Sequence, residues 1–456
     1  MSVTAARSVA LKTLAAVRER DAYLGPVLEA QLSRATLSEA DHALVTRLAR
    51  GVIEALGTLD DVLDARIAKP GSVEPRVRDA LRLAAYEILF MRTPARAAVH
   101  QGVEAVRRVR PQASGLANAV LRRLADEADT FPWGDPAADP TVMARAAGHP
   151  LWLVKMVAEE SGFDVARLML DANNEPAPLY LRHNPFVAPL DEALSILAAD
   201  GAEPRISPPD ASSVVVQHER AAVRGRALSE GYFLVTDAAA QMAPLAVAAR
   251  PGMKILDAGA GRGTKTLSLQ AAAVLAGGPA DILSLDVHDF KTKLLRERMD
   301  TLGVPGVETV TGDILDPSSI PTPDDGFDAV LLDAPCTGLG TLRRHPEQRW
   351  RVSADDVERM AELQGSMLSA VASLVRPGGH VVYSTCSVAH AENDGVIEGF
   401  LNSPAGSEFR TVSVADIVPA EWQHYLTSQG WFRSIPEPGG PDGHFVARLE
   451  RQASEA

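Results

Sequence analysis

The sequence predicts a chain of three parts: an all-α bundle over residues 1–127, a small α+β region over 128–235 and a doubly wound α/β domain over 236–456. Three observations support this division. Apolar residues recur at helical spacing before residue 125, and from about residue 250 apolar strand-like runs alternate with helical stretches. Between them, ADTFPWGDPAADP at 128–140 has the Pro, Gly and Asp content of a linker.

The composition is that of a folded protein, with 456 residues, 46% of them hydrophobic and 23% charged. No apolar run approaches the roughly 20 residues of a membrane helix, and the N-terminus lacks a signal-peptide pattern. Two cysteines are too few for a disulfide framework or a structural zinc site. We therefore expect a cytoplasmic monomer with no membrane partner and no metal.

The net charge of −14 is unevenly distributed. Residues 1–125 carry 19 Lys and Arg against 13 Asp and Glu, whereas the remainder carries 26 against 46. A basic N-terminal part on an acidic body is compatible with nucleic-acid binding by the N-terminal part.

The N-terminal part is predicted to be helical because its apolar residues follow a period of 3.6. One such stripe consists of Leu44, Val45, Leu48, Val52, Ile53 and Leu56, and TLSEAD at 36–41 supplies a helix cap. Further stripes follow between residues 77 and 124. Residues 141–235 mix helical and short strand-like stretches, and no chemical motif stands out there.

Five strands are predicted in the C-terminal part: MKILDAG, DILSLDV, GVETVTGD, DAVLLDAP and HVVYSTCS, with helices at 288–302 and 355–375 between some of them. Each run ends near a residue that can take part in chemistry, namely Asp257, Asp286, Asp313, Asp333 and Cys386. Ligands of such sheets bind at the carboxyl ends of the strands, so these side chains predict a site.

The glycine-rich loop LDAGAGRGTKT follows the first of these strands. A phosphate-binding loop and a dinucleotide fingerprint both require a glycine where this chain has Thr264. The pattern D-x-G-x-G-x-G from Asp257 to Gly263 instead resembles motif I of class I S-adenosylmethionine-dependent methyltransferases. Asp286, 23 residues after Gly263, can accept hydrogen bonds from ribose hydroxyls.

The two cysteines, Cys336 and Cys386, both follow strand-like runs, and Asp333 lies three residues before the first. A lone buried cysteine is usually a small apolar residue, and a metal site with His345 would lack the usual Cys-x-x-Cys spacing. A thiolate beside a methyl-donor loop fits covalent catalysis on a pyrimidine. Thiol addition at carbon 6 makes carbon 5 nucleophilic enough to take a methyl group, and Asp333 can take up charge near ring nitrogen 3.

Long motifs connect these residues to a known family. DAPCTGLGTLRRHPEQRW and YSTCSVAHAEND resemble motifs IV and VI of the RNA 5-methylcytosine methyltransferases. ARGVIEALGTLDDVLD, LRLAAYEILFMRTPARAAVHQGVE and LANAVLRRL resemble the NusB RNA-binding fold. This pairing is similar to the RsmB/Sun branch, which methylates small-subunit (16S) rRNA, and the resemblance covers nearly the whole chain.

The resemblance implies a Rossmann-like methyltransferase domain, RNA as partner and S-adenosylmethionine as cofactor. It makes Cys386 the nucleophile, Cys336 an aid to product release and Asp333 a contact to the cytosine. Arg343, Arg344 and Arg349 are expected to reach RNA phosphates. The residues expected at the cofactor are Gly259, Ala260, Gly261, Arg262, Gly263, Thr264, Lys265, Asp286, Asp313 and Asp333.

The loop departs from the family at two positions, because Arg262 and Thr264 stand where the family usually has proline and glycine. Three other functions remain open at this stage: a tRNA cytosine methyltransferase, a non-catalytic RNA-binding factor, and a nucleotide hydrolase with a phosphate-binding loop.

Overall fold

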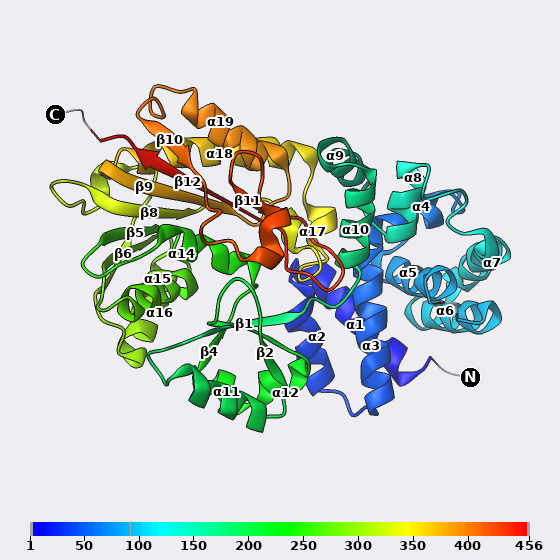
Figure 1. Cartoon of the computed structure of the whole chain (residues 1–456). Coiled ribbons are helices and arrows are strands. Elements are labelled where there is room, and N and C mark those ends of the chain that lie inside the picture. The colour runs from blue at the N-terminus through cyan, green and yellow to red at the C-terminus, as the bar shows by residue number, and fades with distance from the viewer. Residues whose placement is uncertain (1–2, 92, 454–456) are drawn as a thin grey trace. The chain divides into compact units, whose positions relative to one another are not determined.

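The computed structural model describes residues 3–91 and 93–453 (Figure 1). The chain forms two compact units. Unit 1 consists of Met1–Glu175 and Leu342–Ser353, and unit 2 consists of Pro176–Thr341 and Ala354–Ala456. Each unit therefore contains two separate stretches of the sequence.

The regular structure of unit 1 is helical, as the apolar stripes predict. Ser38 caps α3, since its hydroxyl accepts a hydrogen bond from the Asp41 amide at 3.1 Å. The stripe that includes Leu48 and Val52 is buried in the core of the bundle. The helices are α1 (Ala5–Arg20), α2 (Leu24–Ser33), α3 (Glu39–Glu54), α4 (Leu56–Asp64), α5 (Pro75–Leu89), α6 (Ala95–Val109), α7 (Ser114–Asp126), α8 (Pro140–Ala147), α9 (Leu151–Ser161), α10 (Phe163–Asn173) and α17 (Gln348–Arg351).

The second stretch of unit 1, residues 342–353, packs among the N-terminal helices. The indole Nε1 of Trp350 donates to the Ile53 carbonyl at 2.9 Å, and its ring lies against Gly57, where a Cβ atom would come within 2.1 Å of it. Glu347 accepts a hydrogen bond from the Leu24 amide at 3.0 Å. Residues 342–353 and the N-terminal helices, although far apart in the sequence, therefore share the interior of unit 1.

Unit 2 contains a small antiparallel sheet in the order β2-β3-β1-β4. Its central strand β1 pairs with β3 from Leu179 opposite Val216 to Arg182 opposite Ser213, and with β4 on the other side. The elements are β1 (Leu179–His183), α11 (Leu190–Ala199), β2 (Pro204–Ile206), β3 (Ser213–Val216), α12 (Glu219–Arg224), α13 (Arg226–Ser229) and β4 (Phe233–Val235).

Within the part of the chain that the structure describes, the large sheet of unit 2 has eight strands. Seven follow the order β10-β12-β9-β8-β5-β6-β7, and β11 pairs with β12. The five predicted strands are confirmed as β5–β9 and run parallel, whereas β12 is antiparallel to β9, β10 and β11. The strands are β5 (Lys254–Ala258), β6 (Asp281–Asp286), β7 (Val307–Thr311), β8 (Phe327–Asp333), β9 (Val375–Thr385), β10 (Phe409–Val412), β11 (Phe432–Ser434) and β12 (His444–Arg451).

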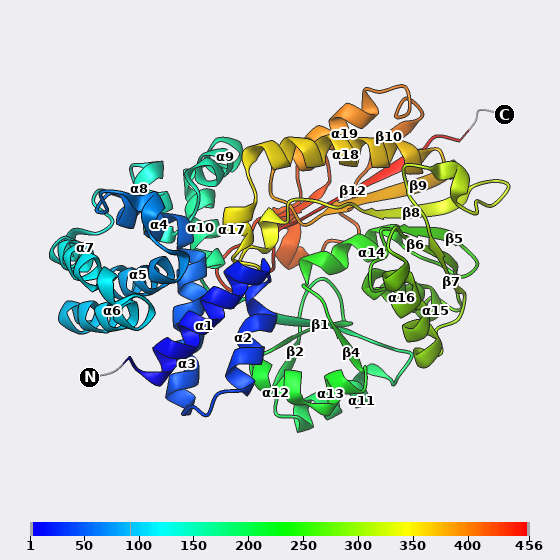
Figure 2. The same ribbon diagram turned by 180° about the vertical axis from the view of Figure 1, so that it is seen from behind.

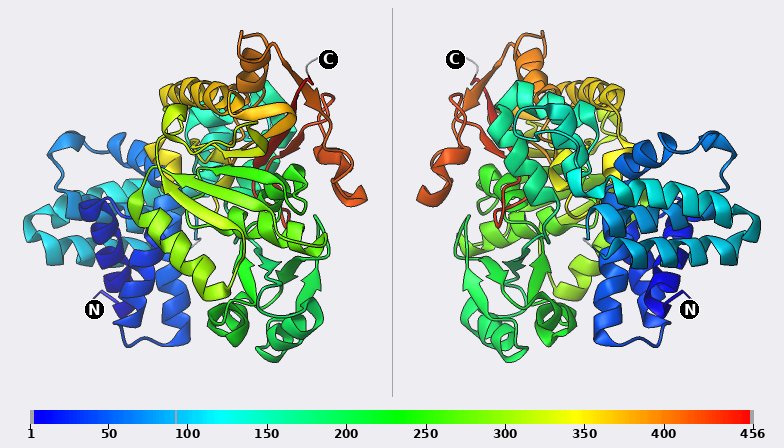
Figure 3. Two further views of the ribbon diagram at one scale, coloured as in Figure 1. Left: turned by 90° about the vertical axis from the view of Figure 1, so that its left-hand side faces the viewer. Right: turned by 90° about the vertical axis from the view of Figure 1, so that its right-hand side faces the viewer.

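Helices cover both faces of this sheet, so its strands are apolar on both sides. Leu256 on β5 packs with α18 and α19, while its neighbour Ile255 packs with α14 and α15 on the opposite face. Figures 1, 2 and 3 show these helices on opposite sides of the strands. The helices are α14 (Met242–Val247), α15 (Thr264–Leu275), α16 (Asp289–Leu302), α18 (Ala354–Ala372) and α19 (Asp394–Leu401).

The strand order reverses direction between β5 and β8, and this reversal positions the site. From β5 the chain moves outward through β6 to β7, then returns to the other side of β5 as β8 and β9. Ala258 pairs with Leu332, and Asp333 pairs with Ser384. The glycine loop and the loops that carry the two cysteines therefore start from neighbouring strand ends, where ligands of such sheets bind.

None of the helices within residues 3–91 and 93–453 is both long enough and apolar enough to span a bilayer.

Candidate active site

A cavity of about 620 Å³ lies at the carboxyl ends of the parallel strands of unit 2. It brings together eight of the predicted residues from the glycine loop, three strand ends and both cysteine loops. These are Gly259, Gly261, Lys265, Asp286, Asp313, Asp333, Cys336 and Cys386. The other four predicted loop residues, Ala260, Arg262, Gly263 and Thr264, shape the turn without lining the cavity.

The glycine loop follows β5 in a conformation that side chains would obstruct. Gly259, Gly261 and Gly263 have φ values of 83°, 58° and 81°. A Cβ atom on Gly259 would lie 2.9 Å from the Asp333 carbonyl, and one on Gly263 would lie 2.8 Å from Leu295. The loop can thus approach both β8 and a ligand closely only because it carries no side chains there.

Asp286 at the end of β6 is held by the same loop. Its carboxylate accepts hydrogen bonds from the Gly261 amide at 3.1 Å, the His288 amide at 2.9 Å and the Lys291 ammonium at 3.3 Å. The side chain is 6% exposed, so its orientation toward the cavity is fixed. Asp313, by contrast, is exposed and caps its own turn through the Leu315 amide at 2.9 Å.

Asp257 lies beneath the loop rather than in the cavity. It is fully buried, and its Oδ2 accepts the Thr266 hydroxyl at 2.5 Å. Its Oδ1 has no hydrogen-bond partner among the described residues. Removal from water raises the pKa of Asp257 to about 6, because the ionised form loses its hydration.

We expect the stability of unit 2 to depend on pH through this residue. The unfolded chain ionises Asp257 near its usual pKa of 3.8, so between about pH 4 and 6 mainly the folded state retains the proton. The free energy of unfolding should therefore fall as pH rises through this window and level off above it. A difference of about two pKa units corresponds to about 3 kcal/mol. Urea unfolding of the wild type and Asp257→Asn at pH 4 and 7 measures this, and equal pH dependence in both would contradict it.

Lys265 and Asp333 form an ion pair in the cavity wall. The ammonium Nζ lies 2.6 Å from Asp333 Oδ2, and the two side chains are 22% and 32% exposed. Burial lowers the pKa of Lys265, but the charge and hydrogen bond of Asp333 outweigh it, so the pKa is raised overall. Lys265 therefore retains its proton beside Asp333 at neutral pH.

The two cysteines lie side by side as free thiols. Their Sγ atoms are 3.2 Å apart, and the Cys386 amide donates to Cys336 Sγ at 3.3 Å. The hydrogen bond to Cys386 and burial raise the pKa of Cys336 well above its usual value. Cys336 therefore stays protonated at neutral pH.

Sequence reasoning missed two further residues. His444, at the start of β12, also lines the cavity. It directly precedes Phe445, which pairs with Thr385 at the end of β9. Glu392, in the turn after Cys386, is fully buried and accepts hydrogen bonds from both cysteine loops. The motif YSTCSVAHAEND contains Glu392, but the sequence does not indicate which residues Glu392 contacts.

The predicted RNA contacts need correction. Arg343 and Arg349 are each 1% exposed, which contradicts the expectation that they reach RNA phosphates. Arg349 donates to Asn174 Oδ1 at 2.8 Å and to the Asn173 carbonyl at 2.6 Å, and burial lowers its pKa to about 10. Arg344 is half-buried, and its role stays a prediction.

The metal alternative required His345 beside the cysteines. His345 belongs to unit 1, where its ring packs edge-on against Tyr23 with centroids 5.5 Å apart. Among the described residues, no group of three His, Cys, Asp or Glu side chains is placed to hold a metal ion.

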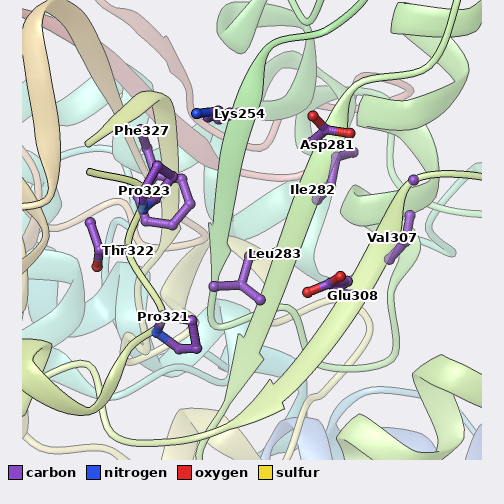
Figure 4. A pocket seen from close by; sticks show the side chains of 11 residues that line it. Lys254, Asp281, Ile282, Leu283, Val307, Glu308, Pro321, Thr322, Pro323 and Phe327 are labelled. Atoms are coloured by element: carbon purple, nitrogen blue, oxygen red, sulfur yellow. The ribbon is translucent and has the colours of Figure 1, made fainter. Parts of the chain in front are cut away.

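A second cavity of about 620 Å³ lies at the opposite, amino end of β5, β6 and β7 (Figure 4). Pro321, Pro323 and Phe327 line one side of it, and Lys254, Asp281 and Glu308 stand around it. Neither cysteine lines it, whereas both line the cavity at the carboxyl ends of the strands.

Comparisons with protein families match three parts of the chain. Residues 244–450 match a family described as 16S rRNA methyltransferase RsmB/F, and residues 4–126 match the NusB family. Residues 149–222 match the ferredoxin-like domain of RsmF/B-like methyltransferases. These matches confirm the predicted fold class of a NusB-like bundle, a small α+β part and a methyltransferase domain.

Two named relatives extend the match. The ribosomal RNA small subunit methyltransferase B of Escherichia coli is 32% identical, with 97% of this chain and 98% of the relative covered. The protein of the same name from Vibrio cholerae is 34% identical over 79% of this chain and 81% of its own. The crystal structure of NSun6 from Pyrococcus horikoshii with SFG shares the fold, with a TM-score of 0.57 at 17% identity over 66% of this chain and 98% of its own. The chain therefore belongs to the ribosomal RNA small subunit methyltransferase B family.

Proposed function

We propose that this protein transfers a methyl group from S-adenosylmethionine to carbon 5 of a cytosine in small-subunit rRNA through a covalent adduct with Cys386. The observation that carries the proposal is the pair of thiols 3.2 Å apart in one cavity with the glycine loop and Asp333. A non-catalytic RNA-binding factor would have no use for this arrangement. A phosphate-binding hydrolase would need a glycine in place of Thr264.

The cavity fits the cofactor. Gly259 and Gly261 leave room for backbone contact, and Asp286 presents a fixed carboxylate where ribose hydroxyls can donate to it. When bound, S-adenosylmethionine supplies an electrophilic methyl group on a sulfonium. Asp313 and Lys265 complete the set of side chains that we assign to the cofactor, and Lys265 also contacts Asp333 on the side assigned to the cytosine.

Replacing Gly259 by alanine tests this assignment. The new Cβ atom would meet the Asp333 carbonyl at 2.9 Å, so we expect S-adenosylmethionine to bind at least about tenfold more weakly. Gly252→Ala is the matched control, because Gly252 also has a positive φ of 71° but no atom of the described residues lies within 4 Å of the added Cβ. Equal affinities of the two variants in calorimetry would contradict the role of Gly259.

The residues of this chain divide the reaction into two steps. The Cys386 thiolate adds to carbon 6 of the cytosine, and the electron pair displaced toward the ring lets carbon 5 take the methyl group. Solvent then takes the proton from carbon 5, the electron pair of that C–H bond forms the double bond between carbons 5 and 6, and the pair of the bond between Cys386 and carbon 6 returns to sulfur. We assign help in this release to Cys336, whose raised pKa supports a role as the protonated partner of Cys386.

Asp333 and Lys265 are assigned to the ring itself. Addition at carbon 6 places negative charge on ring nitrogen 3, which must be neutralised by a hydrogen bond or a proton. The Lys265 ammonium, 2.6 Å from Asp333 in the cavity wall, can supply the hydrogen bond or the proton, while the Asp333 carboxylate holds it in place.

The names of the relatives support small-subunit rRNA as the substrate. The test is methyl transfer from labelled S-adenosylmethionine to unmodified, protein-free small-subunit rRNA, with total tRNA in parallel and bisulfite sequencing to locate the product. We expect one protected cytosine in the rRNA. Transfer to tRNA alone would overturn the substrate, and transfer to neither would favour the RNA-binding factor.

A further inference from the structure

One buried glutamate is hydrogen-bonded to both cysteine loops. Glu392 has no exposed surface and ends the short turn His390–Glu392. Thr337, directly after Cys336, donates its amide to Glu392 Oε2 at 2.9 Å and its hydroxyl to Oε1. Ser387, directly after Cys386, donates its hydroxyl to Oε1 at 2.5 Å. A single carboxylate therefore holds the residue that follows each cysteine.

The carboxylate is itself fixed in place. Gln364 of α18 donates one amide group to Glu392 Oε2 at 3.0 Å and to the Pro335 carbonyl at 2.8 Å. Tyr383 donates its hydroxyl to the Glu392 carbonyl at 2.7 Å. Gln364 and Tyr383 are both fully buried. The position of the Glu392 carboxylate is therefore fixed, and the carboxylate in turn fixes the loops that donate hydrogen bonds to it.

We propose that Glu392 is a positioning residue that sets the separation of the Cys336 and Cys386 thiols. Glu392 accepts hydrogen bonds from the residue that follows each cysteine, so these bonds constrain both loops at the position next to each sulfur. Glu392 does not line the cavity formed by the described residues, and it acts on the reaction only through the cysteines. The catalytic meaning of this inference rests on the proposed function, because only a two-thiol cycle requires Cys336 to stay beside an adduct held by Cys386.

The donors around Glu392 indicate which replacements the site can tolerate. Oε2 faces two N–H groups, from Thr337 and Gln364, which can only donate. Oε1 faces two hydroxyls, from Thr337 and Ser387, which can also accept. Glutamine at this position can place its carbonyl toward the N–H groups and its amide toward the hydroxyls. Glu392→Gln should therefore keep the loops together, whereas Glu392→Ala removes all four contacts.

The rate of disulfide formation between the thiols measures their separation without any substrate. Diamide takes two electrons and two protons from the thiols as the sulfur–sulfur bond forms, and intact-mass analysis follows the product. In the full-length protein we expect Glu392→Ala to slow this oxidation at least about tenfold and Glu392→Gln to stay near the wild-type rate. Glu398→Ala, an exposed glutamate on α19, is the control and should match the wild type. A wild-type rate in folded Glu392→Ala would overturn the proposal.

A second pair of variants keeps the proposal testable if Glu392→Ala does not fold. Ser387→Ala and Thr337→Val each remove one hydroxyl while the Thr337 amide still reaches Glu392. Each should slow the oxidation, and the double variant should slow it more. A double variant that oxidises at the wild-type rate would also overturn the proposal.

Methylation kinetics separate this inference from the proposed function. Glu392→Ala should lower kcat and leave the KM for S-adenosylmethionine unchanged, because the glycine loop keeps its contacts. Normal methylation by the wild type together with equal oxidation rates in all variants would overturn the inference alone. Unequal oxidation rates with no methyl transfer by the wild type would overturn the proposed function and leave the positioning role standing.

Discussion

Cys386→Ala is expected to abolish methyl transfer, and Cys336→Ala is expected to trap the enzyme on its RNA. Without the Cys386 thiol nothing activates carbon 5, so the rate should fall by at least about a thousandfold. Without Cys336, the adduct should form but release slowly, which leaves a protein–RNA complex that survives denaturant. Methyl-transfer assays and denaturing gels of the two variants with small-subunit rRNA measure these outcomes.

The double variant is the control for the trapped complex. Because the bond to RNA is assigned to Cys386, Cys336→Ala combined with Cys386→Ala should give no complex. A stable complex with Cys386→Ala alone would reverse the two assignments. The position of the sulfurs 3.2 Å apart makes either order geometrically accessible, so the variants decide between them.

Arg349→Met is expected to destabilise unit 1 by about 3 kcal/mol. The guanidinium donates to Asn174 Oδ1, the Asn173 carbonyl and the Gly148 carbonyl in the interior, and methionine cannot replace these donors. Buried acceptors would then lose their partners, and their loss of hydration would remain uncompensated. Hydrogen exchange of the unit 1 amides reports this stability separately from unit 2.

The matched control for this substitution lies two residues away. Arg351 makes an ion pair with Asp21 at 2.8 Å, but Asp21 is 89% exposed. Exposed pairs contribute about 0–1 kcal/mol, so Arg351→Met should change exchange little. If both substitutions had the same effect, the interior contacts of Arg349 would not be the source of its contribution.

The parallel part of the fold could be predicted because its signal is local. Runs such as DILSLDV are apolar on both faces, which is typical of strands covered by helices on both sides. β12 gave a weaker signal, since His444, Arg448 and Glu450 interrupt its apolar residues. It also pairs with β9, more than 50 residues earlier, a relation that no spacing in the sequence indicates.

The site could be predicted only in part, for a similar reason. Residues at strand ends converge by topology, which is why Asp286, Asp333 and Cys386 were found together in one cavity. Arg343 and Arg349 were misjudged because arginine is rarely buried, and an interior arginine requires partners distant in the chain. Glu392 was missed because its partners Thr337 and Gln364 are likewise distant in the sequence.

The return of the chain to unit 1 at Leu342 affects how unit 1 folds during translation. Residues 176–341 must all be synthesised between the two stretches of unit 1. At about 5–20 residues per second this takes roughly 8–33 s. During that interval the nascent bundle lacks Arg349 and Trp350, which later satisfy Asn174 and the Ile53 carbonyl. The part of the protein that emerges first is therefore completed only after more than half of unit 2 has been translated.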